Sequence, residues 1–169
     1  EAIVDKGIPV LATSSTCTFT LRDEYPHLLD VDNTGLREHI ELATRFLWRK
    51  LESGQTLPLG KLPLKAVYHT PCHMEKMGWS IYTLELLRLI PGLELTVLDS
   101  RCCGIAGTYG FKRENYPTSQ AIGAPLFRQI EESGADIVVT DCETCKWQIE
   151  MSTSKRCEHP ITLLAKALA

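Results

Sequence analysis

Short apolar runs alternate with amphipathic stretches along most of the chain. Runs of mainly apolar residues predict buried strands, and they lie at residues 8–13, 65–70, 93–98 and 136–140. Apolar residues at helical spacing predict helices over residues 18–29 (broken near Pro26), 36–52, 79–90, 119–132, 145–152 and 160–169. Strands that alternate with helices indicate an α/β fold with a mainly parallel sheet and flanking helices.

One stretch rich in glycine and proline divides the chain. Residues 53–63 contain Gly54, Pro58, Gly60 and Pro63, which is typical of a linker or an exposed loop. The alternation of strands and helices is regular only after this stretch. We therefore expect a domain boundary near residue 60.

Two segments on either side of this boundary resemble each other. Residues 10–19 align with residues 138–147, and each has an apolar strand, then Thr-Cys, then an aromatic residue two positions on. In this alignment Ser14 stands where the second segment has Cys142. The repeat pattern has no recognisable beginning before Glu1, so we expect the chain to be part of a longer protein. We interpret residues 1–60 as the tail of a degenerate upstream repeat plus a linker, and residues 61–169 as a complete repeat with a C-terminal helix.

Composition narrows the class of protein. The 169 residues are 44% hydrophobic and 23% charged, as in ordinary globular domains. The net charge of −3, without a cluster of basic residues, argues against nucleic acid as a partner. No apolar run approaches the roughly 20 residues that a membrane span needs. Paired acids, a nucleophile beside a base, and a phosphate-binding loop are all missing from the sequence, so a self-contained hydrolase or transferase has no support.

Six of the seven cysteines follow predicted strands, and five of these six lie within residues 61–169. Because the carboxyl ends of parallel strands meet at one edge of a sheet, these thiols are expected to converge there. They are Cys72, Cys102, Cys103, Cys142 and Cys145. Cys17 also follows a predicted strand, and it is either a former ligand or a small core residue. Cys157 lies outside the pattern and is expected to be structural or exposed.

Several chemistries use gathered thiols. A thioredoxin-like dithiol needs only Cys142-x-x-Cys145, and zinc needs four ligands. A disulfide network is also open, although the adjacent Cys102 and Cys103 cannot pair comfortably with each other. An iron–sulfur site takes several thiolates from different loops and fits the pattern best. Gly104 and Gly107, which follow the cysteine pair, are candidates for pointing backbone N–H groups at such a cofactor; the alternative is a flexible glycine loop.

Three motifs together resemble a known family. Tyr68-His-Thr-Pro-Cys72-His, Cys102-Cys-Gly-Ile-Ala-Gly107 and Asp141-Cys-Glu-Thr-Cys145 are similar to the cysteine-rich CCG domain of heterodisulfide reductase and of the iron–sulfur proteins of glycolate and lactate oxidation. This resemblance covers about residues 62–150. In that family the domains occur in pairs behind a ferredoxin-like module. The gap of 29 residues between Cys72 and Cys102 is slightly short for the family, and the gap of 38 residues between Cys103 and Cys142 is slightly long.

The resemblance implies a cofactor and a role. The five cysteines named above would ligate a [4Fe–4S] cluster, of non-cubane form in heterodisulfide reductase. The wider sequence, including Glu75-Lys-Met-Gly-Trp79 and Thr108-Tyr-Gly-Phe111, resembles proteins of anaerobic glycerol 3-phosphate oxidation. By this resemblance the chain would relay electrons from flavin-containing dehydrogenase subunits toward membrane quinone in that pathway. It would have no catalytic residue of its own and would sit peripherally on the cytoplasmic face of the inner membrane. Two alternatives stay open: a zinc-binding or metal-free docking domain that helps to anchor the complex to the membrane, and a cluster that itself cleaves a disulfide or reduces quinone.

Other residues near the cysteines have two interpretations. His69 and His73 flank Cys72 and either lie beside the cofactor, as supporting groups or proton carriers, or are loop histidines bonded to the backbone. Glu143 is expected to face solvent. Trp79, Trp147 and Tyr109 are expected to pack rather than to carry electrons.

Overall fold

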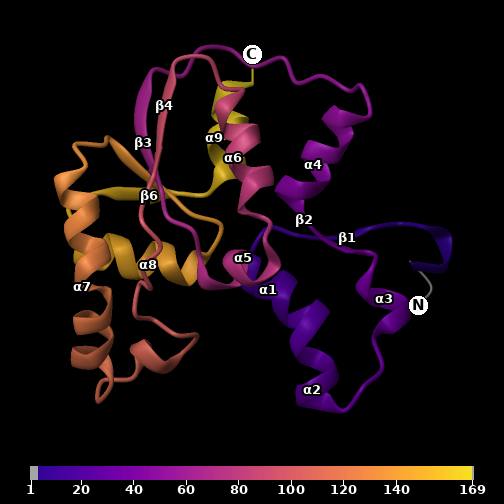
Figure 1. Ribbon diagram of the computed structural model, residues 1–169, viewed down its shortest axis with the longest axis horizontal. Helices are drawn as coiled ribbons and strands as arrows, with labels where there is room; N and C mark the ends of the chain where they lie inside the picture. The colour runs from indigo at the N-terminus through magenta and orange to yellow at the C-terminus, as the bar shows by residue number, and fades with distance from the viewer. Residues whose placement is uncertain (1–3, 169) are drawn as a thin grey trace.

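The larger sheet has four parallel strands in the order β4-β3-β5-β6 in a computed structural model that describes residues 4–168 (Figure 1). The strands are β4 Leu93–Val97, β3 Leu64–Tyr68, β5 Ile137–Val139 and β6 Arg156–Glu158. All neighbouring pairs are parallel, which confirms the predicted α/β class. Residues 1–3 of the expected upstream segment and Ala169 of the expected C-terminal helix lie outside the described residues.

Helices cover both faces of this sheet. On one face, α6 (Ser80–Arg88) and α9 (Pro160–Ala167) pack over Tyr68 and Val139, with α4 (Ala43–Glu52) beside them. On the other face, α7 (Tyr116–Glu132) and α8 (Glu143–Ser152) pack over Val67 and Val138. Side chains alternate between the faces of a strand, and both faces are buried here. This is why β5 is a continuous apolar run rather than an alternating one.

The predicted helix over residues 36–52 is wrong in its first part. Residues Ile40–Leu42 form strand β2, which pairs in parallel with β1 (Val10–Ala12) in a separate two-stranded sheet. All three residues of β2 are buried. A helix would have turned one of three consecutive residues toward solvent, whereas β2 is covered on both of its faces and buries all three. Helix α4 begins only at Ala43.

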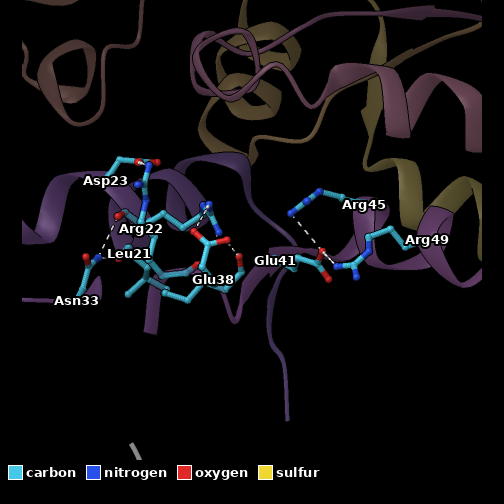
Figure 2. Close-up of polar contacts among 10 residues, drawn as sticks. Leu21, Arg22, Asp23, Asn33, Glu38, Glu41, Arg45 and Arg49 are labelled. Atoms are coloured by element: carbon cyan, nitrogen blue, oxygen red, sulfur yellow. Dashed lines mark hydrogen bonds and ion pairs between the residues drawn. The ribbon is translucent and has the colours of Figure 1, made fainter. Parts of the chain in front are cut away.

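Polar side chains hold the segment before β2 in its non-helical path (Figure 2). Arg22 donates hydrogen bonds from Nη1 to the carbonyl oxygens of Arg37, at 2.5 Å, and Ile40, at 2.8 Å. Asn33 donates from Nδ2 to the carbonyl oxygen of Leu21 at 2.8 Å. Arg22 thus satisfies two carbonyl groups that a continuous helix over residues 36–52 would have paired internally.

Buried charge in β2 is compensated by the following helix. Glu41 is buried and accepts a hydrogen bond at 2.5 Å from Nη1 of Arg49 (Figure 2). Arg45 lies 3.2 Å from the same carboxylate oxygen. The remaining elements are short: a 3-10 turn Val4–Lys6, α1 Ser15–Phe19, a π-helical turn Thr20–Glu24, α2 Tyr25–Leu29, α3 Thr34–Arg37, α5 Cys72–Met77 and η3 Tyr109–Phe111.

Two parts of the chain share the same order of elements. Apart from the π-helical turn, α2 and α3, which lie between α1 and β2, the order β1–α1–β2–α4 corresponds to β5–α8–β6–α9, and in each part the two strands are parallel neighbours. Ser14 and Cys142 both stand at the N-caps of the first helices. Cys17 and Cys145 are both the third helical residue. The structural correspondence therefore follows the register of the sequence alignment.

The predicted linker packs against the core of the larger sheet rather than extending into solvent. Leu57, Leu59 and Leu62 lie against the core that α6 and α9 cover. Leu59 also forms an antiparallel bridge with Leu168. Glycine and proline correctly predicted a segment without regular structure, but the partly buried leucines between them pack against the core. Within residues 4–168, no helix combines the length and the hydrophobicity needed to cross a membrane.

Candidate metal centre

All five predicted cysteines line one cavity at the carboxyl edge of the larger sheet. The cavity has a volume of about 270 Å³. Cys102 and Cys103 lie in the loop after β4, and Cys142 is the N-cap residue of α8. Cys72 and Cys145 lie in the first turns of α5 and α8, not in loops, because each helix begins within a few residues of the end of its strand.

The five thiols form a continuous chain of contacts. The Sγ atoms of Cys103 and Cys145 lie 3.3 Å apart and are buried. The thiols of Cys72 and Cys103 are close enough to shift the pKa of Cys102, and the thiol of Cys145 is close enough to shift that of Cys142. The parallel sheet thus brings together thiols that are up to 73 residues apart in the sequence.

These contacts divide the thiols into two kinds. Hydrogen bonds from Cys103 and Cys72 hold the pKa of Cys102 well below its usual range, and a hydrogen bond from Cys145 lowers the pKa of Cys142 to about 5. The partners hold their protons more tightly: bonding to Cys102 raises the pKa of Cys103 to about 12. The pKa values of Cys72 and Cys145 are raised for the same kind of reason.

The thiols therefore fit a group that supplies positive charge. Five thiolates in one partly buried cavity repel one another, and iron ions would offset that repulsion. Among the described residues, no three His, Cys, Asp or Glu side chains are arranged to hold a single metal ion. A tetrahedral zinc site would need four such ligands around one point. Thiols distributed along a cavity wall suit a cluster of several ions better.

The glycine loop contributes a backbone donor. The N–H group of Gly104 donates to Cys102 Sγ at 3.3 Å. The carbonyl oxygen of Gly104 accepts a hydrogen bond at 2.8 Å from Oγ of Ser119 on α7. The same Ser119 oxygen accepts a hydrogen bond at 2.9 Å from Nε2 of Gln148 on α8. Gly107 lines the cavity. Ser119 and Gln148 carried no sequence signal, because their role depends on contacts between helices.

The sequence profile of the "Cysteine-rich domain", CCG, matches residues 66–150, which is half of the chain and includes all five cysteines. The chain belongs to the CCG family. It is 85% identical over its whole length to one of the subunits of the anaerobic glycerol-3-phosphate dehydrogenase of Escherichia coli strain K12, and it spans 43% of the length of that protein.

Other relatives are more distant. The chain is 34% identical over 143 residues to "Lactate utilization protein A" of Geobacillus thermodenitrificans; the match covers 79% of the chain and 58% of that protein. It is 33% identical over 96 residues to an uncharacterized iron–sulfur protein of Methanocaldococcus jannaschii, covering 56% of the chain and 19% of that protein. The names of these proteins associate relatives of the CCG domain with iron–sulfur and dehydrogenase proteins.

The two histidines of the CCG domain differ in their surroundings. His69 is buried, which lowers its pKa, and it bonds Thr140 through Nδ1 and the carbonyl oxygen of Arg101 through Nε2, each at 3.2 Å. It therefore ties the cysteine-pair loop to the sheet through the backbone. His73 lines the cavity, and its Nδ1 lies 3.1 Å from Oγ1 of Thr16.

A buried polar group beside Cys142 was missed by sequence reasoning. Asp141 is fully buried and accepts hydrogen bonds from the hydroxyl of Tyr68, at 2.5 Å, and of Thr83, at 3.0 Å. Because the single proton of the Thr83 hydroxyl goes to Asp141, the Thr83 oxygen accepts a hydrogen bond at 2.9 Å from the hydroxyl of Thr44 of α4. The quoted motif contained Asp141, but nothing local to it indicated partners on β3 and α6. The network fixes the residue that precedes a candidate ligand.

The remaining predicted residues lie around or outside the site. Cys17 is exposed, whereas Cys157 is buried in β6, where burial raises the pKa of its thiol to about 12. Glu143 is exposed, as expected. Trp79 packs away from the thiols, beneath the guanidinium groups of Arg22 and Arg45. Trp147 contacts Phe111 but is half exposed, so it packs less completely than expected.

Proposed function

We propose that this chain binds an iron–sulfur cluster and relays electrons within an anaerobic glycerol-3-phosphate dehydrogenase complex. The observation that carries the proposal is the meeting of five cysteine thiols in one cavity. Membership of the CCG family and the similarity to the E. coli protein support it. When bound, such a cluster supplies one-electron chemistry.

The five cysteines would hold the group, which we take to be of the [4Fe–4S] type, either cubane or non-cubane in form. The N–H group of Gly104 stabilises negative charge on Cys102, and the buried Ile105 keeps that side of the cavity apolar. Hydrogen bonds to sulfur and burial are the means by which a protein sets a cluster's reduction potential. Apart from the thiols and His73, the described residues that line the cavity carry no acid or base, which suits a relay better than a catalytic site.

The partners follow from the proposed place in the complex. Flavin-containing dehydrogenase subunits would donate electrons, and membrane quinone would be on the acceptor side. The chain would lie at the cytoplasmic face of the inner membrane, held peripherally. Residues 1–60 would be the end of an upstream CCG repeat that has lost one ligand at Ser14, and residues 61–169 the intact repeat. The matching order of elements in the two parts supports this division.

The test uses the full-length complex purified without oxygen. The electron paramagnetic resonance signal of this site is identified as the one lost in Cys102→Ser and retained in Cys17→Ser, whose thiol is exposed and outside the cavity. We expect glycerol 3-phosphate to reduce the site and a soluble quinone to reoxidise it. If glycerol 3-phosphate reduces the flavin of the complex but does not change the signal of this site, the proposed electron relay is wrong. If Cys102→Ser loses no signal, the proposal that this cavity binds a cluster is wrong.

A further inference from the structure

The cavity is not built from the intact repeat alone. Thr16, in α1 of the N-terminal part, lines the cavity beside Cys72 and Cys142. The backbone N–H group of Ser15 donates to the carbonyl oxygen of Asp141 at 2.8 Å, which fixes α1 against the start of α8. Phe19 of α1 stacks on the ring of His73, with ring centroids 4.8 Å apart. Three contacts thus hold α1 at the site.

Cys142 lies between two equivalent threonines. Oγ1 of Thr144 is 3.2 Å from Cys142 Sγ, and Oγ1 of Thr16 is 3.6 Å from the same sulfur. In the alignment of residues 10–19 with residues 138–147, Thr16 and Thr144 occupy the same position. Each part of the chain therefore presents the same hydroxyl to one thiol.

Ligation fixes the direction of these bonds. A cysteine that binds iron is a thiolate, which can only accept a hydrogen bond, so both threonine hydroxyls must donate to Cys142. The Thr16 oxygen is then left as an acceptor, and His73 donates to it from Nδ1. The result is a chain of donors from His73 through Thr16 to the sulfur of Cys142.

We propose that the degenerate N-terminal repeat acts as a positioning element that tunes the reduction potential of the neighbouring site through Thr16. This inference rests on the proposed function, because it requires Cys142 to be a cluster ligand. A hydrogen bond to a thiolate ligand favours the reduced, more negative state of the site. The N-terminal repeat has Ser14 in place of a cysteine ligand, whereas its Thr16 keeps a hydroxyl that bonds to Cys142 of the other repeat.

The test is a redox titration of the site's electron paramagnetic resonance signal in the anaerobic full-length complex. Thr16→Val keeps the shape of the side chain and removes the donor. We expect it to disfavour reduction by up to tenfold, a shift of about −59 mV for a one-electron step. Thr144→Val should shift the potential in the same direction. Thr16→Ser, which restores a hydroxyl, should return the potential to that of the parent.

The control is Thr20→Val, in the adjacent helical turn, where the hydroxyl donates to Glu24 and not to the site. Iron content is measured for every variant. The role of Thr16 is overturned if Thr16→Val has the iron content of the parent and an unchanged reduction potential. It is also overturned if the potential shifts by the same amount in Thr16→Val and Thr20→Val. Either result leaves the proposed function standing. If Cys102→Ser retains all the iron of the parent, both proposals are overturned.

Discussion

Gly104→Ala is the substitution whose cost can be worked out most directly from the structure. Gly104 has a φ of +88°, in the left-handed region. A Cβ atom there would overlap the carbonyl oxygen of Ser119, and it would come within 3.1 Å of the backbone nitrogen of Gly123. These neighbours are backbone atoms of α7, so they cannot swing aside. The cysteine-pair loop would have to separate from the helix.

The loss of stability in Gly104→Ala has two parts. A left-handed conformation costs an L-residue about 1–2 kcal/mol. Separating the loop from α7 breaks the buried bond from Ser119 to the Gly104 carbonyl, and leaving such groups unsatisfied costs about 1–3 kcal/mol. We therefore expect Gly104→Ala to lower the free energy of unfolding by about 2–5 kcal/mol.

Gly107→Ala is the matched control. Gly107 has a φ of +65°, but no atom lies within 4 Å of the position that its Cβ would occupy. Gly107→Ala should therefore lose only the stability that the left-handed conformation costs, about 1–2 kcal/mol. Amide hydrogen exchange of peptides from β3 and β5 reports the opening free energy of this domain within the full-length protein. Equal exchange rates in the two variants would refute the steric explanation.

Three further predictions concern Ser119, His69 and two cysteines. Ser119→Ala should destabilise the domain by about 1–3 kcal/mol in the same exchange assay, because it leaves the Gly104 carbonyl and the Gln148 amide without partners. Burial lowers the pKa of His69 below 6.5, so its contribution to stability is full above pH 6.5 and declines as the pH falls below that value. The stability difference between parent and His69→Gln should therefore shrink from pH 7.5 to 5.5 in urea titrations; a constant difference would contradict this. Iodoacetamide should label the exposed Cys17 quickly and the buried Cys157 only after unfolding, as peptide mass spectrometry would show; equal rates would contradict their placement.

The central part of the fold could be predicted because its signals are local. β3 and β5 are mainly apolar runs, β4 alternates apolar and polar residues as an edge strand does, and the helices between them have regular apolar spacing. The meeting of the five cysteines followed from a single geometric fact, that parallel strands end at one edge. The site was thus predictable from cysteine spacing, although two of its members lie in helices.

The errors have a common physical cause, which is dependence on distant partners. Residues Ile40–Leu42 continue an apolar helical stripe, and only pairing with β1 and the bonds from Arg22 make them a strand. β6 contains one buried residue, Cys157, between two charged ones, so its apolar signal is too short to identify. Thr16 reaches a sulfur 126 residues away. The repeat alignment contained a signal for Thr16, since it paired that residue with Thr144.

The most direct test of the central claim is the metal content of the full-length protein purified without oxygen. Iron, acid-labile sulfide and zinc are measured in the parent, in Cys145→Ser and in Cys17→Ser. We predict that Cys145→Ser loses about four iron and four sulfide per chain relative to the parent, as a [4Fe–4S] site requires, while Cys17→Ser loses none. Zinc in place of that iron, or equal iron in all three proteins, would contradict an iron–sulfur site in this cavity.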